Sequence, residues 1–207
     1  MAAKGASEVS DWPKHPDSSK EHVYAIGMLS INYNELEEIF LGLIDHYNRS
    51  AEGLSAFLFE KLSADVRTEW LKKLMSLHED ESAVHLSMAH LISAYKICTA
   101  NRNLLIHSRI MAHRLTDNDN ALIASKRTRK TGEEKYYEFS LDVIRRVADE
   151  IQFWRGYAGH INAYLNRRAL KEKNLPTGSR LIGPTKLPGE PSLPANLMSD
   201  FLLARED

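Results

Sequence analysis

The chain contains a single cysteine, Cys98, among 207 residues, and its formal net charge is −1. One cysteine excludes a disulfide within the chain and fits a reducing cytosol. The near-zero charge excludes strong attraction of nucleic acid by the chain as a whole, but it is compatible with a local basic patch. No apolar run approaches the length of a membrane span, and the polar N-terminus lacks the apolar part of a signal peptide. We therefore expect a cytoplasmic protein with no membrane partner.

Several enzyme motifs are also absent. The chain has no glycine-rich phosphate loop, no Gly-x-Ser-x-Gly motif and no Cys-x-x-Cys pair. Among nine histidines, His85 and His90 are five residues apart, and His107 and His113 are six apart. Neither is the four-residue spacing that places two zinc ligands on one helix face. We therefore expect neither a metal nor a cofactor.

Two long segments have apolar residues at alternating three- and four-residue steps, which is typical of helices packed in a bundle. The first contains Ile26, Leu29, Tyr33, Leu36, Phe40, Leu43 and Tyr47. The second contains Ile144, Val147, Ile151, Trp154, Ala158, Ile161 and Leu165, and it begins near Ser140. We assign Trp70 and Phe153 to the core as well, whereas Glu37 should be solvated.

Two further helices are expected between these segments. A shorter one follows Ser63, a good N-cap, and a longer one extends from about Glu81 to about Met111. Turn signals come next, and Ala121–Ser125 and Tyr136–Ser140 have the character of short strands. We predict an all-α fold: a four- to five-helix bundle over residues 20–172, with a small β-hairpin at about 115–140 inserted before the last long helix.

The two ends of the chain differ from this bundle. Residues 1–19 form a polar leader that we expect to be flexible, and residues 173–207 form a proline- and glycine-rich tail that we expect to be extended and mobile. The tail ends in the apolar residues Leu197, Met198, Phe201, Leu202 and Leu203. We interpret these as a frayed end in preference to a short helix that docks on the bundle or on a partner.

The most informative residues lie in the run Asn101-Arg102-Asn103-Leu104-Leu105-Ile106-His107. Arginine carries a permanent positive charge and a fork of donors suited to phosphate. Histidine exchanges a proton near neutral pH. On a helical wheel His107 and Asn103 share a face, and Arg102 is long enough to reach them. Arginine and histidine together are a minimal set of groups for cleaving RNA without a metal.

The helix that carries this run has two apolar stripes. One stripe faces the bundle core, and the second consists of Met88, Ile92, Tyr95, Thr99, Ile106 and Ile110. The second stripe needs a covering body, which is either another helix of the chain or a second copy. A symmetric dimer would bring two Arg102–His107 pairs together. In the alternative interpretation, Arg102 pairs with an acidic residue such as Glu37 and His107 bonds to a core carbonyl.

The run Arg102–His107 resembles the Arg-x(4–6)-His signature of the HEPN superfamily, in which a polar residue such as Asn103 commonly follows the arginine. The order of helices, the sequence Asn34-Glu35-Leu36-Glu37 and a β-hairpin after the motif are similar too. The resemblance covers roughly residues 20–170. It implies a helical bundle that dimerises through the motif helices. Catalytic members are metal-independent endoribonucleases, many of them toxins or phage-defence effectors.

By this resemblance, Arg102 would stabilise the charge on the scissile phosphate, His107 would act as general acid or base, and Asn103 would orient the substrate or the histidine. The product would carry a 2′,3′-cyclic phosphate. The basic run Lys126, Arg127, Arg129 and Lys130 could contact the RNA backbone, or it could be a solvated turn. We expect a homodimer, with RNA and an antitoxin as further candidate partners. The alternatives are a non-catalytic helical interaction module and a nucleotide-binding regulator.

Overall fold

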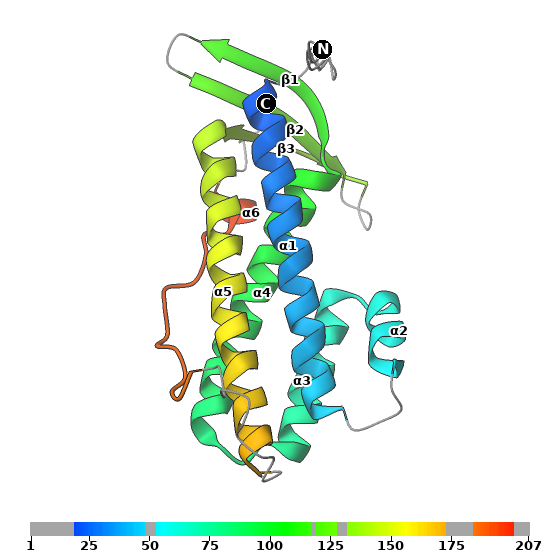
Figure 1. The fold of residues 1–207 in the computed structure, drawn as a ribbon. Coiled ribbons are helices and arrows are strands. Elements are labelled where there is room, and N and C mark those ends of the chain that lie inside the picture. The colour runs from blue at the N-terminus through cyan, green and yellow to red at the C-terminus, as the bar shows by residue number, and fades with distance from the viewer. Residues whose placement is uncertain (1–18, 49–52, 117–118, 128–131, 173–183, 201–207) are drawn as a thin grey trace, which may run out of the picture.

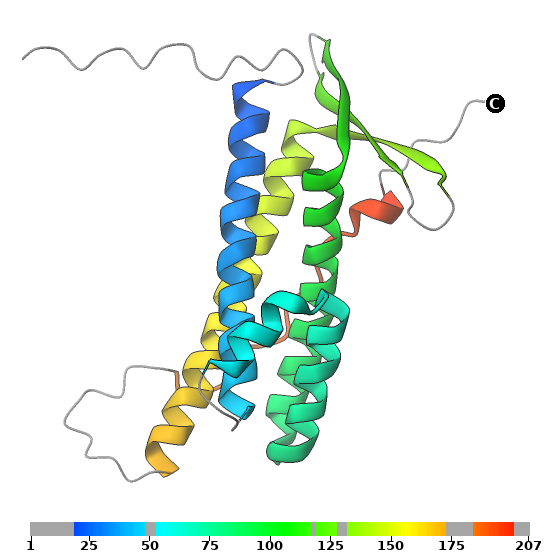
Figure 2. The same cartoon turned by 90° about the vertical axis from the view of Figure 1, so that its right-hand side faces the viewer.

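The computed structural model describes residues 19–48, 53–116, 119–127, 132–172 and 184–200. Three long helices lie side by side: α1 (Lys20–Tyr47), α4 (Ser82–His107) and α5 (Leu141–Glu172). Two shorter helices, α2 (Leu54–Lys61) and α3 (Ala64–His78), flank the lower part of the bundle in Figure 1. Helices α1 and α5 both begin at the end that carries the sheet, and α4 runs the opposite way (Figure 2). The expected helical bundle is confirmed.

Both long apolar patterns lie in the core, as predicted. Phe40 and Tyr95 stack with ring centroids 4.1 Å apart, which joins α1 to α4. Trp154 of α5 is almost fully buried. Phe153 was assigned to the core but is 55% exposed, because it points away from the seam that Trp154 occupies. The Ser63 side chain accepts a hydrogen bond from the backbone of Val66, which confirms the cap of α3.

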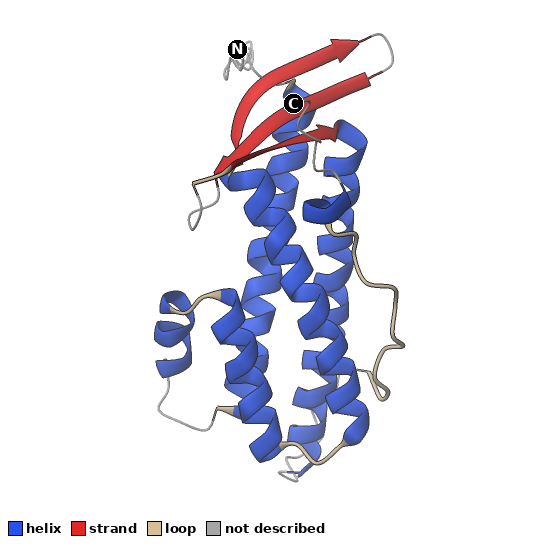
Figure 3. Ribbon diagram, turned by 180° about the vertical axis from the view of Figure 1, so that it is seen from behind, coloured by secondary structure: helices blue, strands red, loops and turns tan. Residues whose placement is uncertain are grey.

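The inserted β structure is a three-stranded antiparallel sheet in the order β1-β2-β3, and it covers one end of the bundle (Figure 3). The strands are β1 (Arg109–Thr116), β2 (Asp119–Arg127) and β3 (Glu134–Ser140). The two predicted strands are present as β2 and β3. The prediction that the third long helix reaches Met111 is wrong, because the helix stops at His107 and β1 pairs with β2 from Arg109↔Ser125 onward.

Residues 184–200, which we call the C-terminal segment, run along α4 and α5 and end in the short helix α6 (Leu197–Asp200). His160 and His90 bind its backbone: the Nε2 atoms lie 2.9 Å from the carbonyl oxygen of Lys186 and 2.6 Å from that of Pro191. Leu197 is fully buried. For this part of the tail the mobile interpretation is wrong and the docked short helix is correct. Phe201, Leu202 and Leu203 lie outside the described residues.

A buried ion-pair cluster closes the end of the bundle opposite the sheet. Glu79, in the turn between α3 and α4, receives two hydrogen bonds from Arg168 of α5 and one from the hydroxyl of Tyr47 of α1. Burial alone would raise the pKa of Glu79, but the bonds from Arg168 and Tyr47 outweigh it and hold the pKa at about 2. Helices α1 and α5 and the turn between α3 and α4 therefore meet at one carboxylate.

We expect this carboxylate to make the fold sensitive to acid. The pKa of Glu79 is depressed from 4.5 to about 2, so its contribution is complete above pH 4.5 and is lost as the pH falls toward 2. A shift of that size corresponds to up to about 3 kcal/mol of unfolding free energy. Urea titrations at a series of pH values should show a steeper loss between pH 5 and 2 for the parent than for Glu79→Gln. Glu38→Gln, on the exposed face of α1, is the matched control, and identical profiles for all three chains would contradict the assignment.

We also expect the only thiol to be inert in the folded chain. Burial raises the pKa of Cys98 to about 12. Reaction with dithionitrobenzoate at pH 8 should therefore be roughly a thousandfold slower in the native protein than in urea. Rapid reaction of the folded chain would contradict the packing of α4 described above.

Candidate functional site

The last turns of α4 present the motif residues in different directions. Asn101 and Leu104 are buried, Arg102 and Asn103 are half-buried, and His107 is exposed. Successive residues differ by about 100° around a helix axis. The core-facing residues therefore fix the helix while their neighbours remain available. The helix ends directly after His107, so the histidine stands at the rim of the bundle, next to the sheet.

The three predicted catalytic residues contact one another. Arg102 Nη1 lies 2.9 Å from Asn103 Oδ1 and 2.9 Å from His107 Nε2. Because a guanidinium only donates hydrogen bonds, Nε2 of His107 must accept here, and the ring proton is then on Nδ1. In this arrangement the lone pair of Nε2 is occupied by the hydrogen bond from Arg102.

Arg102 is supported from α1. Its Cζ atom lies 5.4 Å from the ring centroid of Tyr33, within the range of a cation–π contact. The hydroxyl of Tyr33 is hydrogen-bonded to Thr99 of α4 at 2.8 Å and donates to Glu37 at 3.3 Å. Burial raises the pKa of Tyr33, so this hydroxyl stays protonated. The aromatic ring is thereby held as a platform beneath the guanidinium.

The alternative interpretation of the motif, in which Arg102 pairs with Glu37, is not found. Glu37 forms an ion pair with Arg67 of α3 and also accepts a hydrogen bond from Tyr95 at 3.2 Å. This carboxylate is half-buried, so the prediction that it is solvated is wrong. His107 is exposed and bonds to Arg102 instead of a core carbonyl.

A groove of about 890 Å³ opens where the end of α4 meets the sheet. We call it the basic groove, and its lining residues are Asn103, His107, Arg109, Ser125, Lys126, Arg127, Glu134, Lys135, Tyr137 and Met198. It brings Asn103 and His107 together with Lys126 and Arg127 of the predicted basic run. Arg102 does not line it directly but bonds to two residues that do. Arg129 and Lys130 lie outside the described residues.

The charge of the groove comes from all three strands. Arg109 of β1, Lys126 and Arg127 of β2 and Lys135 of β3 line it, against one acidic residue, Glu134. The Nζ atom of Lys126 donates to the carbonyl oxygen of Asn103 at 3.1 Å, and burial lowers the pKa of this lysine. Lys126 therefore also ties the sheet to the motif helix. Sequence reasoning missed Arg109 and Lys135, because only strand pairing, such as Lys126↔Lys135, brings them to the groove.

The second apolar stripe of α4 is largely covered within the chain. Met88, Ile92 and Tyr95 are buried, and Ile106 is partly buried against the core. Beyond the end of α4, Ile110 and Met111 of β1 reach solvent and are 37% and 44% exposed. Of the two covering bodies considered from the sequence, the chain itself therefore supplies most of the cover.

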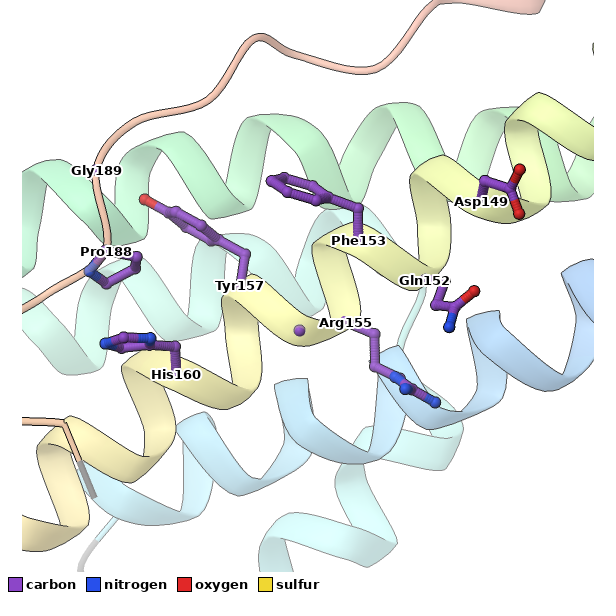
Figure 4. Close-up of a pocket in the computed structure, with 9 residues that line it drawn as sticks. Asp149, Gln152, Phe153, Arg155, Tyr157, His160, Pro188 and Gly189 are labelled. Atoms are coloured by element: carbon purple, nitrogen blue, oxygen red, sulfur yellow. The ribbon is translucent and has the colours of Figure 1, made fainter. Parts of the chain in front are cut away.

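A second hollow, of about 550 Å³, lies on the outer face of α5 (Figure 4). Phe153, Tyr157 and His160 project from α5, and Pro188 of the C-terminal segment lies beside Tyr157 and His160. Its basic groups are engaged within the chain, since Arg155 forms an ion pair with Glu35 and His160 bonds to the carbonyl of Lys186. The basic groove is therefore the stronger candidate for chemistry.

No group of three or more histidine, cysteine, aspartate or glutamate side chains in the described ranges is arranged to hold a metal ion. No helix in the part of the chain that the structure describes is both long and apolar enough to cross a membrane.

The chain was compared with protein-family models, with curated proteins and with solved structures, and none of the three comparisons returned a match.

Proposed function

We propose that this chain is a metal-independent endoribonuclease of the HEPN kind, with Arg102, His107 and Asn103 as its catalytic residues. The observation that carries the proposal is the convergence of the three side chains: one guanidinium nitrogen lies 2.9 Å from both the asparagine oxygen and the histidine nitrogen. This contact unit stands beside a groove whose lining includes four cationic side chains and one carboxylate. A phosphodiester fits both features.

Arg102 would serve as the phosphate contact. The two non-bridging oxygens of a phosphodiester share one negative charge, and each is a stronger acceptor than an amide oxygen or a neutral imidazole. A bound phosphodiester would therefore take over the Nη1 donor that His107 and Asn103 now share. Once the guanidinium turns to the phosphate, Nε2 of His107 is released as a free base. Substrate binding would thus free His107 from its hydrogen bond with Arg102 and allow it to remove a proton from the substrate.

The proposed reaction is transfer of the phosphoryl group to the neighbouring ribose hydroxyl. His107 Nε2 removes the proton of the 2′-hydroxyl, the 2′-oxygen attacks phosphorus, and the bond to the 5′-oxygen breaks. Arg102 stabilises the negative charge that gathers on the phosphoryl oxygens. The leaving 5′-oxygen takes a proton from water or from an imidazolium. The products are a 2′,3′-cyclic phosphate and a free 5′-hydroxyl, and no metal is needed.

A homodimer is part of this proposal. Ile110 and Met111 leave an exposed apolar edge next to the motif, which a second copy could cover. A twofold arrangement would place a second His107 near the leaving oxygen, so that one histidine acts as base and the other as acid. A toxin or phage-defence role would fit such an enzyme.

We expect cleavage to depend on the two charged motif residues. Purified protein, incubated with single-stranded RNA in excess chelator, should yield fragments with cyclic phosphate ends. Arg102→Ala and His107→Ala should each reduce the cleavage rate by roughly 10²–10⁴-fold. The matched controls are Arg145→Ala and His78→Ala, which change exposed residues that do not line the groove.

The outcomes separate the candidate functions. If the parent leaves RNA intact while both motif variants fold like it, a non-catalytic interaction or nucleotide-binding module becomes the better description. If His107→Ala cleaves as fast as the parent, the general-base role is wrong.

We expect the sheet to supply phosphate contacts. Arg127→Ala and Lys135→Ala should each weaken binding of single-stranded RNA and lower the slope of log affinity against log salt by about 0.7. Lys73→Ala, on the exposed face of α3, should leave both quantities unchanged. Fluorescence anisotropy across a salt series measures them. Equal slopes in all four proteins would exclude the basic groove as the RNA path.

A further inference from the structure

The C-terminal segment is held by the residue that directly precedes the catalytic arginine. The side-chain nitrogen Nδ2 of Asn101 donates to the carbonyl oxygen of Ala195 at 2.7 Å. The side-chain oxygen Oδ1 of Asn101 accepts from the backbone nitrogen of Leu197 at 3.0 Å. Asn101 is buried, with 1% of its surface exposed. Both polar ends of one side chain are therefore committed to the backbone of a segment about 95 residues further along the chain.

Other side chains fix the same segment. His90 of α4 lies within hydrogen-bonding distance of the carbonyl of Pro191, and the carboxyl group of Glu150 of α5 accepts from the backbone of Ala195. Leu197 is completely buried against the core. This docking carries the next residue, Met198, to the basic groove, where it joins His107 and Asn103 in the lining.

We propose that the C-terminal segment forms one wall of the substrate groove, with Met198 as a residue that contacts the substrate and Asn101 as a positioning residue. This inference rests on the proposed nuclease function and deepens it. Met198 is 44% exposed, so part of its thioether side chain is available to a ligand. The sheet side of the groove offers mainly cations, which suit phosphates.

Met198 offers a different surface. A thioether is apolar, polarisable and flexible, and it packs well against the edge or face of an aromatic ring. A nucleobase next to the scissile phosphate is such a ring. The two sides of the groove thus match the two parts of a nucleotide: the strands take the backbone, and the C-terminal segment takes a base.

The test uses the full chain and a fluorescent single-stranded oligonucleotide with 2′-O-methyl groups, which has no free 2′-hydroxyl and is not cleaved. Met198→Asp places a negative charge on the proposed wall and should weaken binding roughly tenfold, the scale of one repulsive contact near a protein surface. Leu193→Asp is the matched control. It adds the same charge to an equally exposed position (45%) of the same segment, outside the basic groove.

Each outcome decides something. Selective weakening by Met198→Asp supports the inference, and it does so even when the parent does not cleave ordinary RNA, a result that would overturn only the nuclease proposal. Cleavage by the parent with equal binding by both aspartate variants overturns the inference alone. A parent that binds no oligonucleotide overturns both.

Asn101→Ala provides an independent measurement. Loss of its side chain should speed hydrogen exchange of the Leu197 amide, because that N–H loses its acceptor. Binding of the oligonucleotide should weaken in parallel, and melting temperature checks that the bundle is intact. Fast exchange at Leu197 with unchanged binding would show that the docked segment is not a wall of the groove.

Discussion

Three consecutive residues of α4 contact three different parts of the chain, and these contacts determine the geometry of the candidate site. Each step along a helix turns by about 100°, so Asn101, Arg102 and Asn103 together span most of the circumference. Asn101 binds the C-terminal segment, Arg102 lies over Tyr33 of α1, and the backbone of Asn103 is bound by Lys126 of β2. Parts of the chain far apart in sequence therefore converge on one helical turn. A short motif gains a defined geometry only in this surrounding.

The five-residue spacing of Arg102 and His107 has a related consequence. It separates the two positions by about 7.5 Å along the axis and about 140° around it, so they do not share a face. Short side chains could not meet across that gap. The long arginine reaches the histidine, and its fork of donors serves Asn103 from the same nitrogen. Helix α4 ends at His107, whose imidazole is exposed, and β1 begins two residues later.

The sequence predicted those features that one helix or one local pattern determines. The seams through Leu36 and Ile151, the cap at Ser63, the strands β2 and β3 and the meeting of Arg102 with His107 all follow from periodicity or local chemistry. Strand β1 was missed because the apolar pair Ile110 and Met111 continues the helical pattern. Only pairing with β2 makes this segment a strand. The burial of Glu37 was missed for the same reason: its partner, Arg67, lies 30 residues away on another helix.

The overall composition does not predict the positive charge of the basic groove, and the distribution of charged residues in the fold explains why. A formal net charge of −1 argues against a nucleic-acid-binding protein only if charge is spread evenly. Here acidic groups are used inside the bundle, where Glu79 and Glu81 bind Arg168 and Glu37 binds Arg67. The opposite charges of such ion pairs largely cancel, so the pairs contribute little to the electrostatic field outside the protein. The cations on the three strands are collected on one side of one groove, so their fields add at the place where Asn103 and His107 are exposed to a ligand. An almost neutral chain can thus present a site with a local excess of positive charge, whose position follows from the sheet and not from the total charge.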